Sequence, residues 1–188
     1  MEAFFISTAL VAVAEIGDKT QLLALVLAAR YRKPFPIILG ILIATLANHA
    51  LAAWIGAAVA GWVGTEAMRW ILVATFLAMA TWCLVPDKAD DGPQTARTAG
   101  AFLATLVAFF IVEIGDKTQI ATVALAARFN SLLLVTAGTT LGMMLANVPV
   151  VLFGDAIARR LPLRIVRATA AMLFAALGVA AIFMPSGL

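Results

Sequence analysis

Long apolar stretches separated by short polar connections run through the whole chain. Six such stretches are predicted to form helices, at residues 3–29, 35–60, 66–85, 99–127, 131–157 and 163–184. An α-helix needs about 20 mostly apolar residues to cross the hydrocarbon core of a bilayer. The pattern therefore predicts an all-α, polytopic membrane protein with six transmembrane helices.

The longest polar connection, at residues 86–97, divides the six segments into two sets of three. We expect one three-helix repeat over residues 1–85, a cytoplasmic loop over 86–97 and a second three-helix repeat over 98–188. The seven residues EIGDKTQ at 15–21 recur at 113–119, which is 98 residues later. Because three crossings are an odd number, the second repeat must enter the membrane from the opposite side. The sequence thus predicts inverted repeats, which are typical of secondary transporters.

Composition and charge agree with this topology. The chain is 64% hydrophobic and only 12% charged, with a mean hydropathy of +1.05, whereas soluble domains are about 25% charged. Nine Lys and Arg residues fall on the face reached after the first segment: Arg30, Arg32, Lys33, Lys88, Arg97, Arg159, Arg160, Arg164 and Arg167. The opposite face has only Arg69 and Arg128. The positive-inside rule places the nine in the cytoplasm and both termini outside, which explains the basic pI without a nucleic-acid partner.

The repeated motif places charged residues in the middle of otherwise apolar segments. On a continuous helix, residues three or four apart share a face. The motif is therefore predicted to form a polar stripe in each half, and a two-fold relation would bring the two stripes face to face. The stripes consist of Glu15, Asp18 and Gln21 in the first half and of Glu113, Asp116 and Gln119 in the second.

Two further features of the motif bear on its structure. Lys19 and Lys117 each follow the glutamate of their own motif by four residues, so each lysine can pair with that glutamate on a helix. Gly17 and Gly115 leave room for a bend, or for close approach of the two backbones.

The charge count of the two motifs points to an ion. An ionised side chain at the bilayer centre costs about 2.5–3.5 kcal/mol, so six unpaired ones would cost on the order of 15–20 kcal/mol. Four carboxylates and two ammoniums leave two negative charges, which one divalent cation or two protons would neutralise. We therefore expect Glu15, Asp18, Glu113 and Asp116 to be metal ligands, and we expect protons to compete with the metal for them.

The remaining donors near the motifs are mostly oxygens, which suit Mg²⁺, Ca²⁺ or Mn²⁺. Additional candidates for the metal site or a proton pathway are Gln21, Gln119, Thr20, Thr118, Lys19, Lys117, Asn48 and Asn147. His49, the single histidine, follows Asn48. A hydrogen-bonded packing role is the favoured interpretation of His49, and metal ligation or proton relay is the alternative.

Two other functions would also place acids in the middle of a membrane. An intramembrane aspartyl protease resembles G-x-G-D on one helix, but Glu15 and Glu113 stand where that pattern has glycine. An exporter of basic amino acids or other small organic cations would use the same excess negative charge. The identical motif in both halves favours a compact, symmetric ligand over an amino acid.

Two E-x-G-D-K-T motifs in a six-segment chain with a central loop resemble the UPF0016, or Gdt1, family of cation/proton exchangers. The resemblance covers nearly the whole chain. It implies export of Mn²⁺, with Ca²⁺ as the other candidate, in exchange for protons, and it maps the family's motif acids onto Glu15, Asp18, Glu113 and Asp116. It also implies a multi-pass protein of the bacterial inner membrane that is a transporter and not an enzyme. No resident cofactor is expected, and a homo-oligomer is compatible with the sequence.

Overall fold

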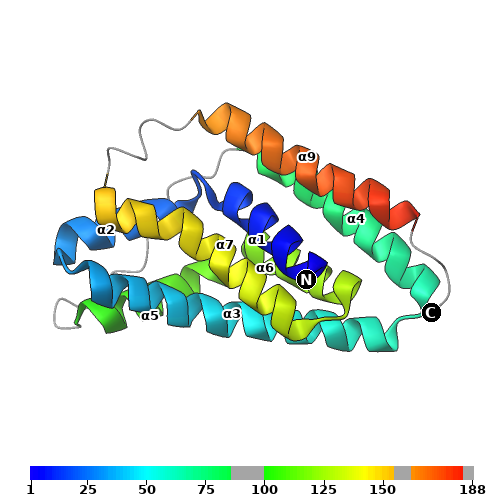
Figure 1. Cartoon of the computed structure of the whole chain (residues 1–188), viewed down its shortest axis with the longest axis horizontal. Coiled ribbons are helices and arrows are strands. Elements are labelled where there is room, and N and C mark those ends of the chain that lie inside the picture. The colour runs from blue at the N-terminus through cyan, green and yellow to red at the C-terminus, as the bar shows by residue number, and fades with distance from the viewer. Residues whose placement is uncertain (86–99, 155–161, 184–188) are drawn as a thin grey trace.

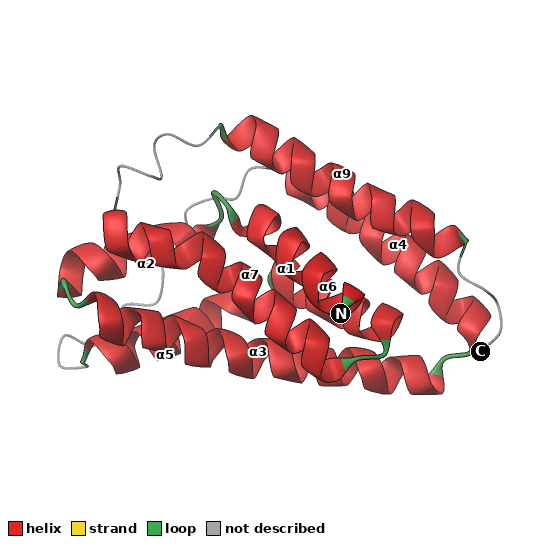
Figure 2. Cartoon of the chain, in the orientation of Figure 1, coloured by secondary structure: helices red, strands yellow, loops and turns green. Residues whose placement is uncertain are grey.

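A computed structural model describes residues 1–85, 100–154 and 162–183 of the chain. Every regular element in these ranges is an α-helix (Figure 2). In chain order the helices are α1 (Glu2–Glu15), α2 (Lys19–Tyr31), α3 (Pro34–Trp62), α4 (Thr65–Leu84), α5 (Ala101–Glu113), α6 (Lys117–Phe129), α7 (Leu132–Phe153) and α9 (Leu163–Ile182). The all-α prediction is therefore confirmed, while the polar loop expected at 86–97 lies outside the described residues.

The first and fourth apolar segments are broken in the middle, so the prediction of one continuous helix for each is wrong. In the first segment, α1 ends at Glu15 and α2 begins at Lys19. In the fourth segment, α5 ends at Glu113 and α6 begins at Lys117. Each break contains a glycine with positive φ, +80° at Gly17 and +76° at Gly115. A side chain is strained in this conformation, and glycine is not. The bend allowed by these glycines is thus a complete interruption of the helix.

Four helices are long and apolar enough to cross a membrane, within the ranges that the structure describes. These are α3, α4, α7 and α9, with 29, 20, 22 and 20 residues. They agree with the second, third, fifth and sixth predicted segments, and most of their ends differ by only a few residues. The half-helices α1, α2, α5 and α6 have only 13 or 14 residues each, and each pair covers one predicted segment.

Equivalent contacts relate the two halves of the molecule. The helix α3 packs on α5, and α7 packs on α1 (Figure 1). A Cβ atom at Gly40 would lie 2.9 Å from the carbonyl oxygen of Phe102, and one at Gly138 would lie 2.5 Å from that of Phe4. Gly40 and Phe4 precede Gly138 and Phe102 by the same 98 residues that separate the motifs. Contacts exchanged in this way are those that a two-fold relation produces.

The helices α4 and α9 lie alongside each other and complete the bundle (Figure 1). Their contact is apolar, with the buried rings of Phe76 and Phe174 6.5 Å apart between centroids. At its first turn, α9 also reaches the break between α1 and α2, because Leu163 lies where a Cβ of Gly17 would be. The third helix of each half therefore packs mainly on its counterpart, and α9 covers the first motif.

Candidate cation-binding site

The structure brings the two motifs together through two equivalent ion pairs. Lys19 Nζ lies 3.0 Å from Asp116 Oδ1, and Lys117 Nζ lies 3.0 Å from Asp18 Oδ1. Each lysine therefore pairs with the aspartate of the other motif. The expected pairing of each lysine with its own glutamate assumed a continuous helix, and that premise is wrong because the helix ends between the two residues.

Three carboxylates converge between the broken helices. One oxygen each of Glu15, Asp18 and Asp116 lies within 4.8 Å of the other two. The three residues are 0%, 1% and 3% exposed. Three buried carboxylates at this spacing form a set of hard oxygen donors of the kind that Mn²⁺, Mg²⁺ and Ca²⁺ take. The structure thus groups three of the four expected metal ligands.

The fourth expected ligand, Glu113, has a different neighbour. Its Oε2 lies 3.5 Å from Nε2 of His49 on α3, and both side chains are fully buried. Among the described residues, neither carboxylate oxygen of Glu113 has a hydrogen-bond partner. Glu113 nevertheless interacts electrostatically with Glu15, as do Asp18, Asp116 and Lys117. Among the described residues, however, Glu113 is not one of the three whose oxygens lie within 4.8 Å of one another, and its carboxylate faces His49 of α3.

The threonines of the two motifs differ in what they bind. Thr20 donates a hydrogen bond to Glu15, whereas Thr118 donates one of 3.2 Å to Asp116. Both hydroxyls lie within the carboxylate cluster and are fully buried. The equivalent threonines therefore orient different carboxylates, which makes the site asymmetric although its sequence is repeated.

The glutamines hold the breaks together. Gln21 Oε1 accepts a hydrogen bond of 2.8 Å from the Gly17 N–H, and Gln119 Oε1 accepts one of 2.7 Å from the Gly115 N–H. The amide nitrogen of Gln21 also donates to the carbonyl oxygen of Ala146 on α7, at 2.8 Å. These amides, which the sequence offers as further candidates for the metal site or a proton pathway, stabilise the backbone turns in this structure.

The asparagines expected near the site come from α3 and α7, and both are fully buried. Asn48 donates to the carbonyl oxygen of Phe110, one turn before Glu113, at 3.1 Å. Asn147 donates to the carbonyl oxygen of Met143 in its own helix, also at 3.1 Å. The side-chain oxygens of Asn48 and Asn147 have no hydrogen-bond partner within the described residues. Both residues therefore keep a buried amide oxygen, able to bind a cation, near the ends of the half-helices.

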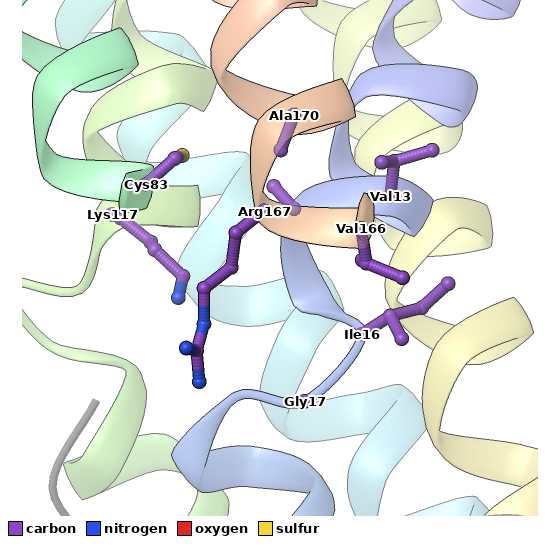
Figure 3. Close-up of a pocket in the computed structure, with 9 residues that line it drawn as sticks. Val13, Ile16, Gly17, Cys83, Lys117, Val166, Arg167 and Ala170 are labelled. Atoms are coloured by element: carbon purple, nitrogen blue, oxygen red, sulfur yellow. The ribbon is translucent and has the colours of Figure 1, made fainter. Parts of the chain in front are cut away.

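A small cavity adjoins the break between α1 and α2. Its lining includes Gly17 and Cys83, and the side chains of Lys117 and Arg167 both reach into it (Figure 3). Lys117 is the partner of Asp18, so the cavity extends from the cluster toward the first turns of α9. Sequence reasoning assigned Arg167 only to topology and gave His49 no contact with Glu113. Both contacts arise from helix packing, and a local sequence pattern contains no signal for them.

Comparison with known proteins gives a family match over both halves. The family model described as "Divalent cation/proton antiporter GDT1" matches residues 3–91 and 101–186. The two matched ranges agree with the two halves that the repeated motif defines.

Relatives of this chain come from bacteria and plants. A Vibrio cholerae protein named "Putative manganese exporter" is 54% identical over 97% of this chain and 92% of its own length. A GDT1-like protein of Synechocystis is 27% identical over 93% of each chain. GDT1-like protein 5 of Arabidopsis thaliana is 26% identical over 98% of this chain and 97% of its own length. No solved structure matches the chain.

Proposed function

This chain belongs to the GDT1 family of divalent cation/proton antiporters, and from this premise we propose that it exports Mn²⁺ from the cytoplasm in exchange for protons. The name of the 54% identical Vibrio cholerae relative supports Mn²⁺ as the metal. The family consists of transporters and not of enzymes, so the buried acids serve ion exchange and the protease alternative is excluded.

The observation that carries this proposal is the set of converging carboxylates of Glu15, Asp18 and Asp116. We assign the metal site to these three residues together with Glu113, which holds the position of Glu15 in the second motif. Thr20 and Thr118 orient the carboxylates, and Asn48 and Asn147 keep oxygen atoms available to the ion or to protons. The hard oxygen donors suit Mn²⁺ and Ca²⁺ alike, so the preference for Mn²⁺ rests on the relative.

Charge balance gives the exchange its mechanism. The ion pairs of Lys19 with Asp116 and of Lys117 with Asp18 balance two carboxylates, which leaves the charges of Glu15 and Glu113. One divalent cation or two protons would neutralise this pair, so the metal and the protons exclude each other from one cluster. Rocking of the two halves about the site would expose it alternately to each side of the membrane.

For the topology, we propose six membrane-crossing segments in two inverted repeats, over residues 1–85 and 98–188, joined by a cytoplasmic loop at 86–97. The broken pairs α1–α2 and α5–α6 each serve as one crossing, since neither half-helix is long enough alone. Discontinuous helices at the interface of inverted repeats are a known way to build an ion site at the midplane. The nine-to-two distribution of Lys and Arg supports placing both termini in the periplasm of a bacterial inner membrane.

Cysteine labelling at two matched glycines tests the topology. Gly64 and Gly100 are each the N-cap of a helix, with φ of −57° and −63°, and a Cβ at either position meets no described residue within 4 Å. In a Cys83→Ala background, a membrane-impermeant thiol reagent added to intact cells should label Gly64→Cys and spare Gly100→Cys. Permeabilised cells should label both variants equally. Equal labelling in intact cells would contradict the inverted topology.

A competition assay tests the substrate. Proteoliposomes containing the purified protein should take up Mn²⁺ when their interior is acidic. Excess Ca²⁺ should partly inhibit this Mn²⁺ uptake. Excess lysine should leave Mn²⁺ uptake unchanged, because the carboxylates are spaced for one compact ion. Inhibition by lysine together with lysine transport would instead support the exporter of organic cations.

A further inference from the structure

His49 occupies a buried position that packing alone does not account for. It projects from α3 to within 3.5 Å of Glu113 on α5, and both side chains are 0% exposed. Within the described part of the chain, neither ring nitrogen of His49 and neither carboxylate oxygen of Glu113 has a hydrogen-bond partner. A buried polar group without a hydrogen bond costs about 1–3 kcal/mol. The contact of 3.5 Å between the two groups recovers only part of this cost, and a cation bound between them would satisfy both.

The spacing of the pair fits two ligands of one metal ion. In octahedral coordination with metal–ligand bonds of about 2.1–2.2 Å, donor atoms on neighbouring positions lie about 3.0–3.1 Å apart. His49 Nε2 and Glu113 Oε2 are 3.5 Å apart, so a shift of about 0.4 Å would bring both atoms to one ion. Glu113 is also the counterpart, 98 residues later, of Glu15 in the carboxylate cluster.

The two halves differ in chemistry at this position. Residue 147, which is 98 residues after His49, is an asparagine. Its side-chain oxygen is buried and without a hydrogen-bond partner among the described residues. One half therefore carries an amide oxygen at the position where the other half carries an imidazole nitrogen.

We propose that His49 is a specificity-determining metal ligand, which with Glu113 favours transition-metal ions such as Mn²⁺ over Ca²⁺ and Mg²⁺. Ca²⁺ and Mg²⁺ take oxygen ligands almost entirely, whereas imidazole nitrogen binds transition ions well. The carboxylates supply affinity for any hard divalent cation, and His49 supplies the preference among them. This inference rests on the proposed exchange function and assigns its metal selectivity to one residue.

Electron spin echo spectroscopy of bound Mn²⁺ tests the assignment directly, on purified protein from which any polyhistidine tag has been removed. His49 is the only histidine in the chain, so nitrogen-14 modulation from an imidazole identifies it without ambiguity. We expect that modulation in the unmodified protein and its loss in His49→Asn, which reproduces the residue found at position 147. Absence of imidazole modulation in the unmodified protein would overturn the proposal, even if the variant fails to fold.

Selectivity measured by transport gives a second readout. In proteoliposomes, His49→Asn and His49→Gln should lower the ratio of Mn²⁺ to Ca²⁺ uptake about tenfold or more, as loss of one group from a metal site does. The ratio should fall mainly through weaker Mn²⁺ transport, with Ca²⁺ transport retained. An unchanged ratio in a folded variant would contradict the role of His49. Failure of the unmodified protein to exchange Mn²⁺ for protons would instead refute the proposed function itself.

Discussion

The two EIGDKTQ motifs have the same sequence and the same backbone break, yet they have different surroundings. The Gly17 turn of the first motif is covered by Leu163 of α9, while at the Gly115 turn of the second a Cβ would touch no side chain of the described residues. Glu15 accepts a hydrogen bond from Thr20 and joins the carboxylate cluster, whereas Glu113 faces His49.

This difference separates what a motif determines from what its neighbours determine. The glycine, aspartate and glutamine of each motif form the same turn, with positive φ and a glutamine closing it. The contacts of the glutamates differ, because Glu15 binds Thr20 of its own motif whereas Glu113 faces His49 of α3. The repeat therefore arranges the charged residues of the two motifs about a two-fold relation. The differences between the two halves make the site asymmetric, which bears on binding and selectivity.

The largest expected effect is loss of transport when a motif acid is neutralised. Glu15→Gln, Asp18→Asn, Glu113→Gln and Asp116→Asn should each lower Mn²⁺ exchange in proteoliposomes about 100-fold, the upper range for loss of a group that supports a metal site. Glu66→Gln is the matched control, because Glu66 is exposed on α4 and contacts Arg69 and Trp70 of its own helix, away from the motifs. A motif variant that keeps near-normal flux would remove its residue from the site.

Neutralising the two aspartates should affect stability unequally. Asp18 pairs with Lys117, whose side chain is 7% exposed, and Asp116 pairs with Lys19, whose side chain is 24% exposed. Removing one partner of a buried ion pair costs about 3–5 kcal/mol, and the more exposed Lys19 side chain can turn away from the vacated site, which relieves part of that cost. Thermal unfolding in detergent should show Asp18→Asn to be the less stable variant.

The double variant Asp18→Asn/Lys117→Gln provides the control for that comparison. It removes both charges of the pair, so it should recover much of the stability that Asp18→Asn loses. Equal stability of the two aspartate variants, with no recovery in the double variant, would contradict the unequal burial of the two pairs.

The equivalent helix crossings should also differ in sensitivity. Gly138→Ala brings a Cβ within 2.5 Å of a backbone oxygen, and Gly40→Ala brings one within 2.9 Å. Overpacking of this kind costs about 1–3 kcal/mol, so both variants should unfold at lower temperature, with Gly138→Ala lower than Gly40→Ala. Gly61→Ala in α3 meets nothing within 4 Å and serves as the control. Its melting temperature should stay the same or rise.

The smallest expected effect is a difference in stability between alanine variants at the two turns. Alanine at Gly17 or Gly115 is strained by the positive φ, at a cost of about 1–2 kcal/mol. Gly17→Ala also overlaps Leu163, with a Cβ 2.4 Å from its Cδ2, so it should be the less stable of the two in the same unfolding assay. In a Leu163→Ala background the two glycine variants should become similar. A persistent difference there would show that Leu163 does not cause it.

Much of the architecture was available from the sequence because it depends on long, regular signals. The apolar segments predicted the helices, and the identical motifs predicted that two charged regions lie together. The break within each motif could not be told from a bend, since a glycine in an apolar segment permits either. Each turn is complete because Gln21 or Gln119 closes it with its side chain. No periodicity in the sequence indicates that role.

The details of the site depend on tertiary contacts that local patterns cannot contain. The pairing of Lys19 with Asp116 joins residues 97 positions apart, and that of His49 with Glu113 joins residues 64 positions apart. A helical spacing rule assigned each lysine to its own glutamate, because that rule sees only neighbours along one helix. The broken helices remove that neighbour relation, and the two-fold packing replaces it with one between motifs.

Mn²⁺ flux under an imposed pH gradient tests the central claim most directly. Proteoliposomes with equal Mn²⁺ on both sides are given an acidic interior in one experiment and an alkaline interior in the other. Exchange of metal for protons at one carboxylate cluster predicts Mn²⁺ accumulation in the acidic vesicles, Mn²⁺ loss from the alkaline ones and neither after an ionophore collapses the gradient. Mn²⁺ movement that follows only its own concentration gradient, whatever the pH on each side, would contradict the exchange mechanism.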